Sequence, residues 1–176
     1  MTFWMSGPKN VLTRNVSVNA TQSGFALYGD TANSCLNTFS DNEAIANTFG
    51  ITVWVLGCDG ASSTLERFRA WHNAVNGFYD YGARNLVLTD FYSRADPTTM
   101  GTARLSKFNW FGDYDPGYST TFTRPNIQNM DIGLYLPYGT ATPTAGPGER
   151  VVTITDGYFY NRTDVLVRMN GLSGSA

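Results

Sequence analysis

The segment from residue 51 to residue 78 constrains the fold most, because it carries the clearest strand pattern and the clearest helix pattern of the chain. Residues 51–56 are β-branched, aromatic and apolar, and a glycine follows them, which predicts a buried strand. Ser63 and Glu66 then stand at the spacing of a capping box. Apolar residues recur every three or four positions after it, namely at Leu65, Phe68, Trp71, Val75 and Phe78. We therefore predict an amphipathic helix at about residues 63–76.

The other apolar patterns favour strands. Val16 and Val18 alternate on one face, and Phe25–Tyr28 forms a further short run. Strands are also expected within residues 85–92, 102–111, 130–136, 151–155 and 157–169, the last two as a hairpin or a long bent strand. Only 15% of the residues are charged and 18 are glycine, which suits a mainly β chain with many turns. We expect one domain over residues 1–176 and, because no repeat of fixed length is visible, no solenoid.

Two long loops interrupt this pattern, at residues 112–125 and 137–149, and a Gly/Ser tail at residues 171–176 is expected to be flexible. The second loop is rich in Pro, Gly and Thr and has no charge before its last residue. Its prolines lower the entropy that the loop would lose on docking, so we expect it to make contacts between subunits. The candidate interface residues are Pro137, Tyr138, Thr142, Pro143 and Pro147.

Charge and cysteine content exclude several classes. The net charge is −2, and no cluster of cations is present, so nucleic-acid binding as the main function is excluded. The longest apolar run, residues 51–57, is too short to span a membrane, and no signal-peptide pattern is visible at the start. Cys35 and Cys58 are too few for a disulfide framework, and we expect them to be reduced.

The sequence offers little for catalysis. His72 is the only histidine and lies beside the apolar stripe of the predicted helix, so we interpret it as a structural residue. Asp113 and Asp115 resemble the start of a calcium loop, but Arg124 occupies the position that would need an acidic ligand. One histidine and two distant cysteines do not make a zinc site. We predict no metal, no cofactor and no enzymatic activity, with a carboxylate-dependent hydrolase as the remaining alternative.

The aromatic residues allow two interpretations. Some could form a platform on which sugars or bases stack. Most, including Trp54, Trp71 and Trp110, fall on the inward phase of the predicted elements, where we expect them in the core. Tyrosines in loops or on uncertain faces, such as Tyr79, could bind a ligand or contact another protein.

The succession of strand, acidic turn and aromatic helix is similar to the centre of the tail tube proteins of long-tailed phages and of the related Hcp tube proteins. The residues that carry this resemblance are Ile51–Val55, Asp59 and Leu65–Trp71, followed by two strand patterns at residues 85–92 and 103–110. The resemblance covers about a third of the chain. It implies a β-sandwich or small barrel with one flanking helix and long loops, in subunits that form rings and stack into a tube around passing DNA.

The first functional hypothesis is therefore a self-assembling structural subunit of a phage particle, a tail tube protein. The resemblance implies that its partners are copies of itself and sheath or other virion proteins, with DNA only as non-specific cargo and no membrane. Its location would be the virion, assembled in the host cytoplasm. The alternatives are a receptor-binding, carbohydrate-binding or capsid-decorating β-domain of a virion, and a small carboxylate-dependent hydrolase.

Overall fold

The computed structural model describes most of the chain, namely residues 1–6, 9–29, 35–36, 38–54, 56, 61–81, 83, 85–95, 109–110, 119–138 and 151–169. These residues form strands, turns and bends, and none of them is helical. The part of the chain that is described therefore contains no helix with the length and hydropathy needed to cross a bilayer. The prediction of a mainly β chain is confirmed.

The strands form three parallel sheets. Sheet A contains β1 (Phe3–Ser6), β4 (Ser23–Tyr28), β7 (Phe49–Trp54), β10 (Asn76–Tyr81), β13 (Asn109–Trp110), β16 (Ile132–Tyr138) and β19 (Thr163–Met169). Sheet B contains β2 (Val11–Thr13), β5 (Thr38–Ser40), β8 (Ser63–Glu66), β11 (Leu86–Thr89), β14 (Ser119–Thr123) and β17 (Val151–Thr155). Sheet C contains β3 (Val16–Val18), β6 (Glu43–Ile45), β9 (Arg69–Trp71), β12 (Tyr92–Arg94), β15 (Asn126–Gln128) and β18 (Tyr158–Tyr160).

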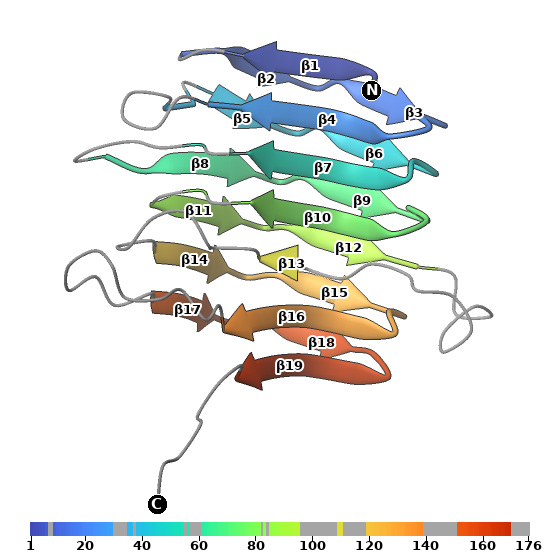
Figure 1. Ribbon diagram of the computed structural model, residues 1–176, viewed down its shortest axis with the longest axis vertical. Coiled ribbons are helices and arrows are strands. Elements are labelled where there is room, and N and C mark those ends of the chain that lie inside the picture. The colour runs from blue at the N-terminus through green and yellow to red at the C-terminus, as the bar shows by residue number, and fades with distance from the viewer. Residues whose placement is uncertain are drawn as a thin grey trace, which may run out of the picture.

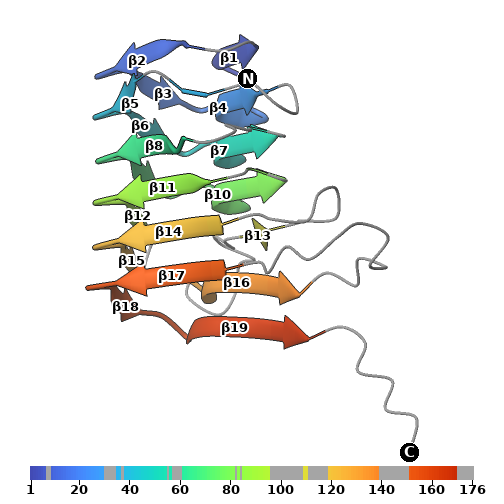
Figure 2. The same cartoon turned by 90° about the vertical axis from the view of Figure 1, so that its left-hand side faces the viewer.

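Successive strands belong to sheets A, B and C in turn, so three strands complete one coil and the next coil starts again in sheet A. Figures 1 and 2 show the coils stacked from the N-terminal coil at one end to β19 at the other. This architecture is a parallel β-helix, a type of solenoid. The β-sandwich or small barrel is not confirmed, because the sheets are parallel and wind around one axis.

The predicted helix at residues 63–76 is wrong. Its residues form β8, β9 and the start of β10, with a corner after each of the first two strands. Arg67 and His72 have positive φ angles of 50° at these corners, a conformation that no α-helix tolerates. In a capping box, the hydroxyl of Ser63 would accept a hydrogen bond from a backbone N–H of its own helix. Here it accepts one from the backbone N–H of Leu36 on the adjacent coil at 3.2 Å.

The corner explains why the pattern looked helical. Leu65 points inward from β8, and the chain then turns at Arg67, so that Phe68 also points into the core. A spacing of three between inward residues therefore arises from two strands and a corner as well as from a helical face. Val75, which the helix would bury, is 36% exposed in the turn before β10.

The expectation that the chain has no solenoid repeat is also wrong. A seven-residue pattern recurs where sheet B passes into sheet C: an apolar residue, then Thr, Ser or Glu, then Arg or Asp, then one variable residue, then the three-residue strand of sheet C. Its six copies are residues 12–18, 39–45, 65–71, 88–94, 122–128 and 154–160. They start as little as 23 residues apart (Leu65 to Leu88) and as much as 34 apart (Leu88 to Phe122). A search for a fixed period misses them, because the segments between sheets A and B differ in length and the segment from β12 to β13, between sheets C and A, is longer than its counterparts.

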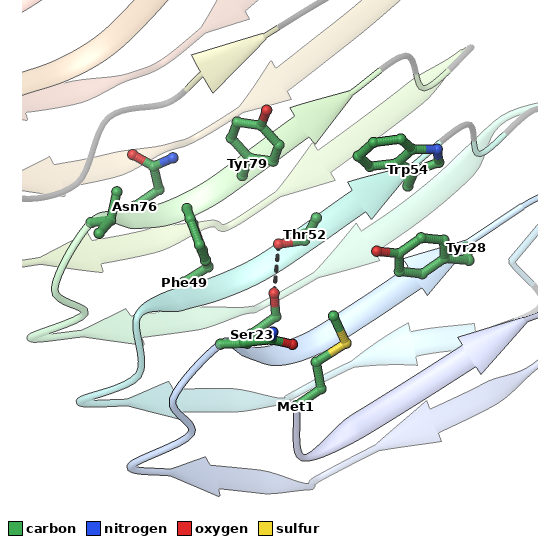
Figure 3. A pocket seen from close by; sticks show the side chains of 10 residues that line it. Met1, Ser23, Tyr28, Phe49, Thr52, Trp54, Asn76 and Tyr79 are labelled. Atoms are coloured by element: carbon green, nitrogen blue, oxygen red, sulfur yellow. Dashed lines mark hydrogen bonds between the residues drawn. The ribbon is translucent and has the colours of Figure 1, made fainter.

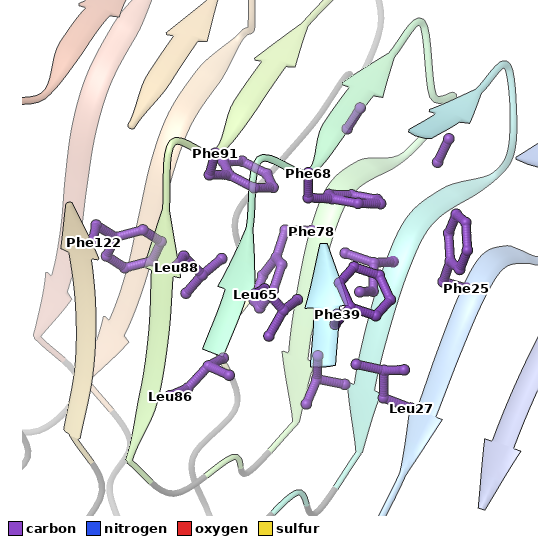
Figure 4. Packing of buried hydrophobic residues seen from close by; sticks show 14 of the residues in the cluster. Phe25, Leu27, Phe39, Leu65, Phe68, Phe78, Leu86, Leu88, Phe91 and Phe122 are labelled. Atoms are coloured by element: carbon purple, nitrogen blue, oxygen red, sulfur yellow. The ribbon is translucent and has the colours of Figure 1, made fainter. Parts of the chain in front are cut away.

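The core fills the inside of the coils with aromatic and aliphatic side chains (Figure 4). The ring of Phe25 contacts those of Phe39 and Phe68 edge-on, with ring centroids 5.6 Å and 5.7 Å apart. Phe68 also packs on Phe91 on the adjacent coil at 6.0 Å, and Phe91 in turn meets Phe78 edge-on at 5.9 Å. Because successive coils contribute rings to the same column, the core is continuous along the solenoid axis.

Buried asparagines close the corner between sheets C and A. Asn73 Oδ1 accepts from the backbone N–H of Asn47 at 3.0 Å, and its Nδ2 donates to the carbonyl of Ala44 at 3.1 Å. Asn47 and Asn161 make the same two kinds of bond to the coil before them. Each asparagine thus satisfies backbone groups that the corner leaves without strand partners.

The corner between sheets B and C carries charges of alternating sign on successive coils. Its residues, all with positive φ, are Arg14, Asp41, Arg67, Asp90, Arg124 and Asp156. Arg67 donates two hydrogen bonds, of 2.7 Å and 2.9 Å, to the carboxyl group of Asp41, and Arg124 donates two of the same lengths to that of Asp90. These guanidinium groups lower the pKa of both carboxyls. Neighbouring coils therefore attract each other at this exposed corner, although solvent keeps the energy of each pair small.

Candidate functional site

The outward face of sheet A carries a run of aromatic side chains over its first coils. β4, β7 and β10 pair in register, with Ala26, Thr52 and Tyr79 side by side, and Tyr28 beside Trp54. The neighbouring residues Phe25, Ile51 and Phe78 point inward and are buried. Alternation from these buried residues places Tyr28, Thr52, Trp54 and Tyr79 on the outward face. Ser23, Phe49 and Asn76 break this alternation and lie on the outward face as well.

Side chains on this face line an open pocket of about 480 Å³, which Figure 3 shows from close by. Its described lining consists of Met1, Gln22, Ser23, Tyr28, Phe49, Thr52, Trp54, Val75, Asn76 and Tyr79. A volume of this size falls in the range of sites that hold small organic ligands. The lining combines aromatic rings with hydroxyl and amide groups, and its described residues include no Asp, Glu, Lys or Arg.

Two aromatic groups flank the pocket. At one end the rings of Trp4, Tyr28 and Trp54 form a column along the solenoid axis, with centroids 4.3 Å and 5.9 Å apart and planes within 15° of parallel. Trp4 is 57% exposed and Trp54 is 38% exposed. At the other end, the ring of Phe49 lies 5.7 Å from that of Tyr79 at an angle of 51°. Rings held this way by their neighbours lose little freedom when a ligand packs against them.

Polar groups lie between the two aromatic groups. The hydroxyls of Ser23 and Thr52 are hydrogen-bonded at 2.7 Å across adjacent strands, as the dashed line in Figure 3 marks. The amide side chains of Asn76 and Gln22 complete the lining at the Phe49 end, because Asn76 pairs with Phe49 and Gln22 precedes Ser23, which also pairs with Phe49. Hydroxyl and amide groups both donate and accept, so this part of the pocket suits a ligand with hydroxyl groups of its own.

Three glycines make the backbone beneath the pocket close-packed. Gly24, Gly50 and Gly77 occupy equivalent positions in β4, β7 and β10, next to the first lining residue of each strand. A Cβ atom on Gly50 would overlap with the carbonyl oxygen of Gly77. Any larger residue there would push the strands apart, so the spacing of the backbone beneath the pocket depends on these glycines.

The strongest electrostatic perturbation lies behind the pocket and does not face it. Asp80 follows the lining residue Tyr79 in β10 but points inward, and its side chain is fully buried. Burial raises the pKa of Asp80 to about 7, against the hydrogen bond that its Oδ1 accepts from the backbone N–H of Ala83 at 2.9 Å. Its Oδ2 has no hydrogen-bond partner within the described part of the chain. Burial also raises the pKa of Tyr79, and the charge of Asp80 adds to that rise.

The candidate residues from the sequence lie elsewhere. Pro137 and Tyr138 are the last residues of β16, paired with Arg168 and Met169 of β19, so they begin the predicted loop as strand. Thr142, Pro143 and Pro147 lie outside the described residues. The other predicted loop, residues 112–125, contains β14 over its described part. The expected subunit contacts of the second loop stay a prediction.

His72 and the cysteines complete this comparison. His72 is exposed at the corner between β9 and β10, where its backbone N–H donates to the carbonyl of Arg94 at 2.9 Å, and it does not line the pocket. Cys35 is disulfide-bonded, so the prediction of reduced cysteines is wrong, and Cys58 lies outside the described residues. Among the described residues no group of His, Cys, Asp and Glu could hold a metal ion.

Sequence reasoning missed most of the pocket. Trp54 was expected in the core, but it points outward, because the alternation of β7 places Ile51 and Val53 inside. Ser23, Phe49 and Thr52 gave no signal of their own, since only the stacking of coils brings them together. The aromatic residues at the ends of successive sheet A strands were the available signal. Comparisons with protein-family models, with curated proteins and with solved structures found no match to the chain.

Proposed function

We propose that this protein binds carbohydrate in the pocket on the outward face of sheet A. The observation that carries the proposal is the lining itself: two aromatic groups on either side of a pair of hydroxyls, with two amides at the Phe49 end. A sugar ring presents C–H groups on its faces and hydroxyl groups at its edges. Aromatic rings complement the faces and hydrogen-bonding side chains complement the edges, so the pocket offers both kinds of partner.

The proposal is one of binding without catalysis. Glycoside hydrolysis uses a pair of carboxyl groups on either side of the scissile bond. The described lining has no carboxyl group, and Asp80, the perturbed carboxyl behind it, is turned to the inside of the solenoid. A rigid stack of coils with a preformed pocket suits a module that holds a glycan in place.

The phage tail tube hypothesis stays an untested prediction. The strand that carries the resemblance is present as β7, whereas its helix is replaced by β8 and β9. Self-assembly, sheath or virion partners, DNA as cargo and a virion location depend on that resemblance and stay predictions with it. A carbohydrate-binding role was one of the alternatives drawn from the sequence, and the pocket supports it through specific side chains.

The experiment is a binding screen on a printed array of neutral and acidic glycans, repeated with two variants. Trp54→Ala removes a ring from the pocket, and Trp71→Ala makes the same change on sheet C, where Trp71 packs on Tyr92 at 4.8 Å. We expect Trp54→Ala to weaken the best glycan about tenfold or more, and Trp71→Ala to leave it unchanged. Absence of glycan binding by the wild-type protein, or equal losses in the two variants, would refute the proposal.

A further inference from the structure

We infer that the glycan is uncharged and that it lies along the strands of sheet A, across the solenoid axis, with one sugar at each of the two aromatic groups. The inference rests on the proposed function, and it adds the class of glycan and the direction in which it is bound. Two separate observations support it: the charges around the pocket and the shape of its lining.

The charges around the pocket favour an uncharged ligand over a carboxylate. Burying an ionised group is unfavourable unless a cation or several hydrogen-bond donors compensate it. The described side chains of the lining offer hydroxyl, amide, aromatic, thioether and aliphatic groups and no Lys or Arg. Asp80 lies directly behind it, and its charge reaches far enough to contribute to the raised pKa of Tyr79. When ionised, Asp80 would repel a uronic acid through the sheet, whereas a neutral sugar would not be affected.

The positions of the aromatic groups indicate the direction in which the glycan lies. Phe49 and Trp54 are the first and last residues of β7, so they lie about 16 Å apart along the strand at the usual rise per residue. Across the strands the described lining extends from Met1, beside β4, to Tyr79 of β10, which is three strand spacings or about 14 Å. The longer dimension therefore follows the strands.

Figure 3 shows Phe49 toward one end and Trp54 and Tyr28 toward the other, with the hydrogen-bonded hydroxyls of Ser23 and Thr52 between them. Tyr79 lies beside Thr52 on the next strand, and its ring reaches that of Phe49. A glycan of several sugars would contact both aromatic groups at once, and its hydroxyls would reach the central pair. A single sugar could contact only one group.

The test is isothermal titration calorimetry with two matched sets of hexasaccharides. The neutral set contains hexamers of glucose, xylose and mannose in β-1,4 linkage and of glucose in α-1,4 linkage. The acidic set contains hexamers of galacturonate and of mannuronate. We expect at least one neutral hexamer to bind with an affinity that does not change between about 0.02 M and about 0.5 M NaCl, and no acidic hexamer to bind.

The direction of the ligand is tested with the neutral hexamer that binds. Phe49→Ala and Trp54→Ala each remove one aromatic group, and we expect each to weaken the hexamer about tenfold or more. The corresponding monosaccharide should bind far more weakly than the hexamer. Trp54→Phe, which keeps a ring, should restore most of the affinity, and circular dichroism checks that each variant is folded.

These experiments distinguish a wrong class or direction of the glycan from the absence of carbohydrate binding. If an acidic hexamer binds as well as the neutral ones, with an affinity that salt weakens, the protein binds glycans but the inference of an uncharged ligand is wrong. If only one of the two alanine variants affects the hexamer, the glycan does not span the pocket along the strand. If neither set binds, the proposed function is refuted and this inference with it.

Discussion

Replacing Asp80 by asparagine tests the account of the core most sharply, because the two side chains differ by a charge and hardly in shape. Asp80 is fully buried in β10, and one carboxyl oxygen accepts from the backbone N–H of Ala83, whereas the other has no partner among the described residues. Burial raises its pKa from 3.8 to about 7. In the folded protein the carboxyl therefore keeps its proton in the range between these two values, whereas in the unfolded chain it is ionised.

The magnitude follows from this difference. The folded state binds more protons than the unfolded state between about pH 4 and pH 7, so the free energy of unfolding falls as the pH rises through that range. A gap of about 3 pKa units at 1.36 kcal/mol each amounts to about 4 kcal/mol, which is fully lost above pH 7. The asparagine side chain of the variant would carry no charge at any pH. Its NH₂ group would take the place of the unpartnered oxygen, and burying this donor without a partner would destabilise the folded variant by about 1–3 kcal/mol.

We therefore expect Asp80→Asn to be more stable than the wild-type protein at pH 8 by about 1–3 kcal/mol, and no more stable at pH 4. Urea unfolding followed by circular dichroism at several pH values measures this directly. Asp90→Asn is the matched control, since Arg124 lowers the pKa of Asp90 and its contribution is lost on acidification. An Asp80→Asn effect that is the same at pH 4 and pH 8 would show that the buried carboxyl is not the source of the pH dependence.

Two further substitutions test the stacking of the coils. Gly50→Ala should destabilise the protein by about 1–3 kcal/mol or more, because the added Cβ would overlap with the carbonyl oxygen of Gly77; unchanged urea unfolding would contradict the close packing of these strands. Asn73→Ala should cost about 2–5 kcal/mol, because it leaves the buried N–H of Asn47 and the carbonyl of Ala44 without their partner, and a loss below about 1 kcal/mol in the same assay would mean that water replaces the side chain.

The strands of this fold were largely predictable, whereas their arrangement was not. Val16 and Val18 share one face of β3 as their alternation indicates, although that face is exposed and Ser17 is buried. The apolar run at residues 51–56 contains most of β7. Alternation reports which residues of a strand share a face, and that signal is local. The predicted final hairpin failed at the next level: β17, β18 and β19 exist, but they lie in three different sheets and pair with earlier coils.

The missing information is the correspondence between coils. The corners of successive coils lie 23 to 34 positions apart, because the segments from sheet A to sheet B, and the one from β12 to β13, differ in length from turn to turn. The corner between sheets B and C keeps its length, so its alternating Arg and Asp residues are the part of the sequence that reveals the repeat. Aligning the six corners also brings Tyr28 to within one position of Trp54, its partner across β4 and β7, which is close enough to recognise an aromatic face.

The most direct test of the account is a spectrum of the tryptophan indole N–H groups during titration with a glycan. The chain has four tryptophans, and ¹⁵N-labelled protein gives one indole signal for each, which the Trp54→Ala and Trp71→Ala variants assign. On addition of a neutral hexasaccharide, we expect the Trp54 signal to move progressively until saturation while the Trp71 signal stays in place. Movement of Trp71 with Trp54 unchanged would place the ligand on another face, and no movement of any indole signal at saturating hexasaccharide would contradict a carbohydrate site on sheet A.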